Sequence, residues 1–180
     1  MMHAASVTPI DHNHDAAVKR PSVHLIGAHT SLAEWRFEIR AGSRFAREQN
    51  YSHALHHYER AVLAADRFAQ LAHDNCFNSV CAVRALFHAR MGKATALSQL
   101  QRIDEAVVVA ERLFFQLCAG AASPVGCTSY RLACCARIPS AQKILIGYLM
   151  NSETPKERLS EIHAIADRVL ANARVTSKAA

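Results

Sequence analysis

Apolar residues recur every three or four positions along most of this 180-residue chain, and this spacing limits the possible folds more than any other feature. Such a period places apolar side chains on one face of an α-helix, whereas a half-buried strand would need alternation. The longest stripe consists of Ala54, Tyr58, Ala61, Val62, Ala65, Phe68 and Ala72. With only 6 Gly and 5 Pro in the chain, the sequence predicts an all-α protein with closely packed helices.

Start and stop signals divide this pattern into antiparallel helical hairpins within one domain. Ser31 and Glu34 have capping-box spacing, so the first helix is expected to begin at Ser31 and to carry an apolar core stripe that includes Trp35. A break at Gln49-Asn50 separates it from a second helix, and two more helices are expected over 75–99, with Val80 on its inner face, and over 103–117. Residues 1–29 show no sustained period and are expected to form a flexible leader before a single domain over 30–180.

A loop is predicted over residues 119–128, after two hairpins that fill 30–118, because this stretch contains Gly120, Pro124 and Gly126. Short helices are expected over 130–137 and 139–150, because Pro139 suits a first helical turn. The last helix is marked by Thr154, Pro155 and Glu157, and it carries an apolar stripe that includes Ile162 and Ala166. Residues 129–175 are therefore expected to form a helical tail that caps the exposed end of the stack, as arrays of helical repeats require.

Charge and composition narrow the class of partner without naming one. Lys and Arg total 21 against 15 Asp and Glu, a formal charge of +6 that suits an acidic protein, a nucleic acid or an anionic surface. No polybasic arm occurs, so nucleic acid is the less favoured partner. The chain has no uninterrupted apolar run of about 18 residues and no secretory signal pattern, which predicts a cytoplasmic protein without membrane insertion.

Cysteine and histidine spacings do not suggest a cofactor. The six cysteines are Cys76, Cys81, Cys118, Cys127, Cys134 and Cys135. Cys76, Cys81 and Cys118 lie in apolar helical patterns and are expected to be reduced, buried thiols, while Cys127 in the loop is the best candidate for an exposed one. His53 and His57 are four apart but lack the further ligands of a zinc site, so solvated histidines are expected. A redox or metal role for Cys127, Cys134 and Cys135 stays open.

The stretch AGSRFAREQNYSHALHHYERAVLAA, which begins at Ala41, resembles a tetratricopeptide repeat at the positions that define that family. The matching residues are Gly42, Phe45, Tyr51, Ala54, Tyr58 and Ala61. Small residues at Gly42 and Ala54 let two helices approach closely, and the aromatic residues fill the space between hairpins.

A weaker second copy, MGKATALSQLQRIDEAVVVAERL, places Ala94, Leu97, Ile103, Ala106 and Leu113 at equivalent positions. It has Ala110 where the first copy has Tyr58. The copies are 52 residues apart, from Ala54 to Ala106, against the usual ~34. The resemblance covers residues 31–118 and implies two divergent, elongated repeats.

The resemblance also implies a binding surface, because the first helix of each such hairpin lines a concave face. The residues assigned to that face, or to the arginine strip beside it, are Arg36, Ile39, Arg40, Ser43, Arg47, His88, Met91, Thr95 and Gln99. The expected function is a non-enzymatic adaptor or chaperone-like holder for an acidic or amphipathic protein segment, with self-association left open. No catalytic residues are predicted, because no nucleophile with a base, paired carboxylates or phosphate loop is visible. The alternative is a regulator that contacts nucleic acid through the strip of Arg36, Arg40, Arg44 and Arg47.

Overall fold

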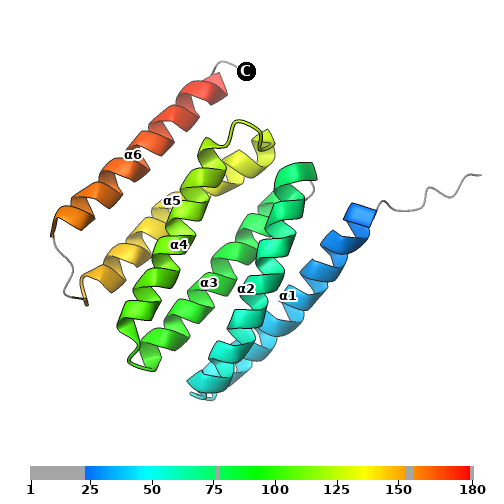
Figure 1. The fold of residues 1–180 in the computed structure, drawn as a ribbon, viewed down its shortest axis with the longest axis vertical. Coiled ribbons are helices and arrows are strands. Elements are labelled where there is room, and N and C mark those ends of the chain that lie inside the picture. The colour runs from blue at the N-terminus through cyan, green and yellow to red at the C-terminus, as the bar shows by residue number, and fades with distance from the viewer. Residues whose placement is uncertain (1–22, 76–77, 153–155, 179–180) are drawn as a thin grey trace, which may run out of the picture.

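Six α-helices form the part of the chain that the computed structural model describes, namely residues 23–75, 78–152 and 156–178 (Figure 1). They are α1 (Val23–Arg47), α2 (Tyr51–Asn75), α3 (Ser79–Gln99), α4 (Ile103–Ala122), α5 (Thr128–Leu149) and α6 (Lys156–Lys178). These ranges contain no strand. The predicted all-α class is therefore confirmed.

Each helix packs against the next helix in the chain, so the molecule is a stack of antiparallel hairpins. Figure 1 shows the array running from α1 at one edge to α6 at the other. Further contacts join α1 to α3, α3 to α5 and α4 to α6. Because α1, α3 and α5 are the first helices of successive hairpins and touch in series, they share one face of the stack.

The first two hairpins turn in the same way. Gln49 and Gln101, which are 52 positions apart, both have left-handed backbones, with φ of 57° and 62°. In each turn the next amide donates to the carbonyl five residues earlier at 2.9 Å, from Asn50 to Phe45 and from Arg102 to Leu97. This hydrogen bond belongs to the Schellman ending of a helix. The two sequence copies therefore fold into two hairpins with one turn geometry.

The predicted apolar stripes form the core. Ala54, Ala61, Ala65, Phe68 and Ala72 of α2 are fully buried or nearly so. Ala106 occupies the same place in the second hairpin as Ala54 does in the first, and both are 0% exposed. Such small residues at the crossing points allow the helices to pack closely. The stripe predicted for the last helix is also confirmed, with its Ile162 and Ala166 side chains buried.

Two details of the front half differ from the prediction. Helix α1 begins at Val23, so Ser31 lies inside the helix as a buried residue and does not cap it. Packing explains the extension, because Ala28 is buried in the core one turn before Leu32. Val80 was expected on the inner face of α3, but it is 65% exposed. Residues 1–22, most of the predicted leader, and Cys76 lie outside the described residues.

The back half is more continuous than expected. Gly120 lies inside α4, where a Cβ atom would come within 2.7 Å of the Cys134 sulfur, so this glycine serves close packing of α5 on α4. Helix α5 is one helix with Pro139 in its interior, although two helices were predicted. Pro139 is exposed, so water can reach the carbonyl oxygen that its missing N–H leaves unbonded. Thr154 and Pro155, the predicted start signals of the last helix, are not among the described residues.

Candidate functional site: a basic groove between α1 and α3

A groove of about 590 Å³ runs between α1 and α3, and a side chain of α2 closes its floor. Seven of the nine residues that the sequence assigned to a binding face line it, namely Arg36, Ile39, Arg40, Ser43, His88, Met91 and Thr95. The other two lie apart from it. Arg47 lies in a separate hollow on α1, and Gln99 is an exposed residue at the end of α3.

Two glycines and a tyrosine give the groove its shape. The Tyr58 ring lies between Gly42 of α1 and Gly92 of α3. A Cβ atom added at Gly42 would lie 2.9 Å from this ring, and one added at Gly92 would lie 2.4 Å from it. Neither helix could carry a larger residue at these positions without moving the ring. Tyr58 therefore keeps α1 and α3 apart at the floor of the groove.

The lining combines apolar surface with positive charge. Leu32, Trp35 and Ile39 of α1 face Met91 of α3 across the groove, and the arginines lie beside them. The indole Nε1 of Trp35 is buried and has no acceptor among the described residues. A groove of this kind suits a segment that presents an apolar side chain next to an acidic one.

The arginines of the groove differ from five other arginines of the chain, which pair with carboxylates. Arg36 and Arg40 of α1 and Arg84 of α3 form no ion pair with any residue that the structure describes. The arginines that do have carboxylate partners are Arg60, Arg67, Arg90, Arg102 and Arg158. The groove therefore carries three positive charges without a carboxylate partner among the described residues, which suits an anionic partner.

His88 lies among these arginines on α3. Burial lowers its pKa below the ordinary value for histidine, and the positive charges of Arg84 and Arg137 lower it further. The imidazole is therefore neutral at pH 7 and can donate one hydrogen bond and accept another. A carboxylate that bound beside it would counter the arginines and favour the protonated form.

The sequence missed three important groove residues: Trp35, Cys81 and Arg84. Trp35 was assigned to the core stripe of the first helix, and Cys81 was expected to be buried, but Cys81 is exposed and lines the groove. Arg84 precedes His88 by four residues and therefore lies on the same face of α3. That spacing was sufficient to predict Arg84.

A second hollow on α1 contains the predicted arginine strip. Arg36, Arg40, Arg44 and Arg47 line it together with Phe37, whose side chain is 67% exposed. Arg36 and Arg40 contribute to both surfaces, whereas Arg44 belongs to the strip and not to the groove. The two surfaces can therefore be tested separately.

The histidines of α2 do not behave as one group. His57 was expected to be solvated, but its Nδ1 donates to Glu38 Oε2 at 2.7 Å, and its ring stacks on Phe45 with centroids 5.3 Å apart. His53 is exposed and contacts Asn50. Within the described ranges, no group of three or more His, Cys, Asp or Glu residues is placed to hold a metal ion.

Cys81 has an exposed thiol, whereas Cys118 and Cys134 are buried, and none of these three forms a disulfide. Burial, aided by the neighbouring Cys135 thiol, raises the pKa of Cys118 to about 11 and that of Cys134 to about 12. At pH 8, only about one Cys118 thiol in a thousand would be ionised, and fewer for Cys134.

We expect iodoacetamide at pH 8 to alkylate the exposed Cys81 at least about 100-fold faster than Cys118 or Cys134, because the thiolate is the reactive form. Peptide mass spectrometry over a time course measures the three rates. Equal rates in the folded protein would contradict the buried positions, and 6 M urea should abolish the difference.

Comparison with protein-family models, curated proteins and solved structures gave no match to this chain. No helix of the described residues is both long and apolar enough to cross a membrane.

Proposed function

We propose that this protein is a tetratricopeptide-like interaction module that holds an acidic, amphipathic segment of another protein in the groove between α1 and α3. The observation that carries the proposal is the combination of an apolar floor with three arginines that have no carboxylate partner among the described residues. Met91 and Ile39 offer flexible apolar contacts, and Arg36 and Arg84 offer charge from opposite walls. The repeated hairpin turn supports the family resemblance.

In this proposal the groove acts by binding and does not itself catalyse a reaction. An acidic side chain of the partner would pair with the arginines, and an adjacent apolar side chain would contact Trp35 and Met91. The buried Trp35 N–H would gain an acceptor from the partner's backbone or carboxylate. An adaptor or a chaperone-like holder needs this type of reversible recognition.

Two charge reversals separate the groove from the arginine strip. Arg84→Glu changes only the groove and Arg44→Glu changes only the strip, while both side chains are exposed. We expect Arg84→Glu to weaken binding of the native partner at least about tenfold, which is about 1.4 kcal/mol. We expect Arg44→Glu to leave the affinity within about twofold. Both should melt like the wild type, because exposed charges contribute little to stability.

The partner is first recovered from the native host with and without nuclease, and its affinity is then measured by calorimetry for all three proteins. The same affinities are measured for a set of amphipathic peptides rich in Glu and Leu, and for the same peptides with Gln in place of Glu. Loss of binding in Arg44→Glu but not in Arg84→Glu, with a steep fall in affinity as salt is added, would instead indicate nucleic acid on the strip.

A further inference from the structure

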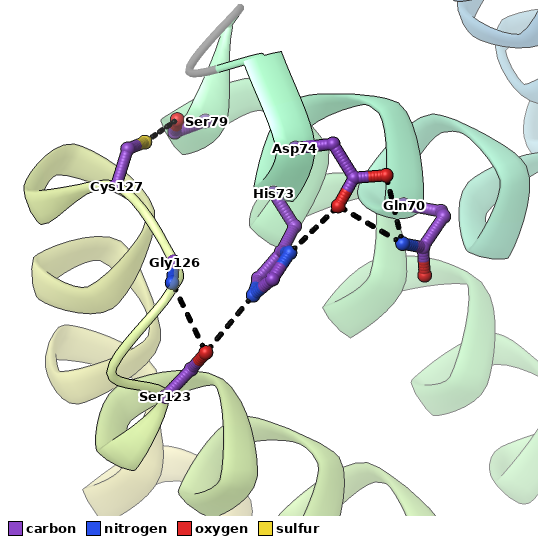
Figure 2. A network of polar contacts seen from close by, with 7 residues as sticks. All are labelled: Gln70, His73, Asp74, Ser79, Ser123, Gly126 and Cys127. Carbon is purple, nitrogen blue, oxygen red and sulfur yellow. Dashed lines mark hydrogen bonds and ion pairs between the residues drawn. The ribbon is translucent and has the colours of Figure 1, made fainter.

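A chain of polar contacts at the opposite end of α2 from the Gln49 turn joins the end of that helix to the loop after α4 (Figure 2). The imidazole of His73 lies between two partners. Its Nδ1 is 2.9 Å from Asp74 Oδ1, and its Nε2 is 3.1 Å from Ser123 Oγ. Gln70 Nε2 in turn donates to both carboxylate oxygens of Asp74, at 2.9 and 3.1 Å. These residues come together although Ser123 and His73 are 50 positions apart.

The chemistry of the partners determines which atom donates in each of these hydrogen bonds. Asp74, as a carboxylate, can only accept, so the His73 proton resides on Nδ1 and Nε2 is left as an acceptor. Ser123 then donates its hydroxyl proton to Nε2. The backbone N–H of Gly126 donates to the same Ser123 oxygen at 3.1 Å, and a donor there favours negative charge on that oxygen. A serine activated by an imidazole that a carboxylate orients is the arrangement of nucleophilic acyl transfer.

A cavity of about 310 Å³ adjoins this serine. Its lining includes Ser123, His73, Gln70 and Asp66, together with Gln116 of α4 and Tyr130 of α5. The Tyr130 ring meets the His73 ring edge-on, with centroids 5.4 Å apart, and restricts its rotation. The volume admits a small molecule with a short acyl chain and is near the lower limit for ligand pockets.

Gln116 supplies an independent sign of a ligand. Its side-chain oxygen Oε1 is buried and has no hydrogen-bond donor among the described residues. A buried amide oxygen without a partner costs free energy, which a bound molecule could recover. Because the two ends of an amide exchange by a half-turn of the side chain, Gln116 can present N–H to a carbonyl oxygen in this cavity.

We propose that Ser123 is the nucleophile of a second, catalytic site, which hydrolyses small activated esters. Ser123 Oγ attacks the carbonyl carbon as its proton passes to His73 Nε2. The bond from that carbon to the leaving oxygen breaks, and the alcohol departs with the proton from His73. Water then attacks the acyl-serine while His73 takes one water proton, and the carboxylic acid leaves as the Ser123 hydroxyl is restored. Ser123 and His73 are the catalytic residues, and Asp74 is a positioning residue.

The test uses the full-length protein with p-nitrophenyl acetate and, separately, a fluorophosphonate probe that labels activated serines. We expect steady turnover of the ester and a single labelled peptide that contains Ser123. Ser123→Ala and His73→Gln should each lower the rate by at least about 100-fold. The matched control is Ser129→Ala, which removes a hydroxyl that contacts Ser79 and Cys127 but no histidine, and it should react like the wild type.

Asp74 is tested by paired variants, because it acts only through the imidazole. Asp74→Asn should slow labelling of Ser123, and Asp74→Glu should restore it in part, whereas a merely structural carboxylate would affect melting and not the labelling rate. A wild-type protein that gains no label at Ser123, or that hydrolyses the ester no faster than Ser123→Ala, would overturn the proposal. The contacts would then serve only to brace α2 against the loop.

Discussion

Removing both partners of the buried Glu38 should cost about 3–5 kcal/mol of unfolding free energy, because a carboxylate would remain buried without compensation. Glu38 is only 1% exposed, with His57 Nδ1 at 2.7 Å from one oxygen and Arg60 Nη2 at 2.9 Å from the other. The variant is His57→Leu combined with Arg60→Leu, and urea unfolding followed by circular dichroism measures the change.

A triple variant controls for the lost packing of the two side chains. Adding Glu38→Met removes the carboxylate with little change in volume, so most of the lost stability should return. If the double and triple variants unfolded at the same urea concentration, the burial of the charge would not be the source of the loss. The loss would then come from the missing packing of the His57 and Arg60 side chains, including the stacking of the His57 ring on Phe45.

The second large effect concerns the ring that holds the groove open. Gly92→Ala should lower the unfolding free energy by roughly 1–2 kcal/mol, because overpacking the Tyr58 ring costs about 1–3 kcal/mol and the better helix propensity of Ala returns part of this. Gly147→Ala is the matched control. Gly147 also lies inside a helix, but its added Cβ would meet nothing within 4 Å. It should therefore raise stability by about 0.5–1 kcal/mol.

Opposite signs for these two Gly→Ala changes would support the close contact at Tyr58, and thermal melting is sufficient to see them. Combining Gly92→Ala with Tyr58→Leu should cost less than the sum of the two single changes, because the smaller side chain makes room. Additive losses would mean that Gly92 and Tyr58 do not share a contact.

The hairpins could be predicted because their signals are local. The period of α2, the break at Gln49 and the repeat of that break at Gln101 lie within short windows of sequence, and packing follows them. Part of the groove lining could also be predicted, because residues three and four apart on α1 and on α3 lie on the same face of each helix. The same spacing should have led from His88 to Arg84.

The side of α3 that faces the core was harder to predict, because apolar residues occur all around the circumference of this helix. Ala82, Val83, Ala85, Leu86 and Phe87 are all buried, so α3 contacts neighbours on several sides. No single stripe marks an inner face in such a helix, and Val80 and Cys81 were therefore placed on the wrong side. Gly120 was interpreted as a helix breaker, although close packing is the reason for a glycine there.

Contacts between distant residues lay beyond any local pattern. Nothing in the spacing of His73 and Ser123 predicts that α2 and the loop after α4 meet, because that meeting depends on how α3 and α4 stack between them. The pairing of Glu38 with His57 likewise depends on how α1 and α2 pack against each other. Such contacts become visible only after the helices are assembled.

The nearest-neighbour contacts of the stack have a consequence for cooperativity. Among the described residues, helix α6 touches α5 and α4 but has no comparable contact with α1, α2 or α3. The C-terminal end can therefore unfold and refold locally as one cooperative unit while the first two hairpins stay folded. A partner bound between α1 and α3 would slow amide exchange mainly in the N-terminal half, and α6 would continue to fluctuate independently of occupancy.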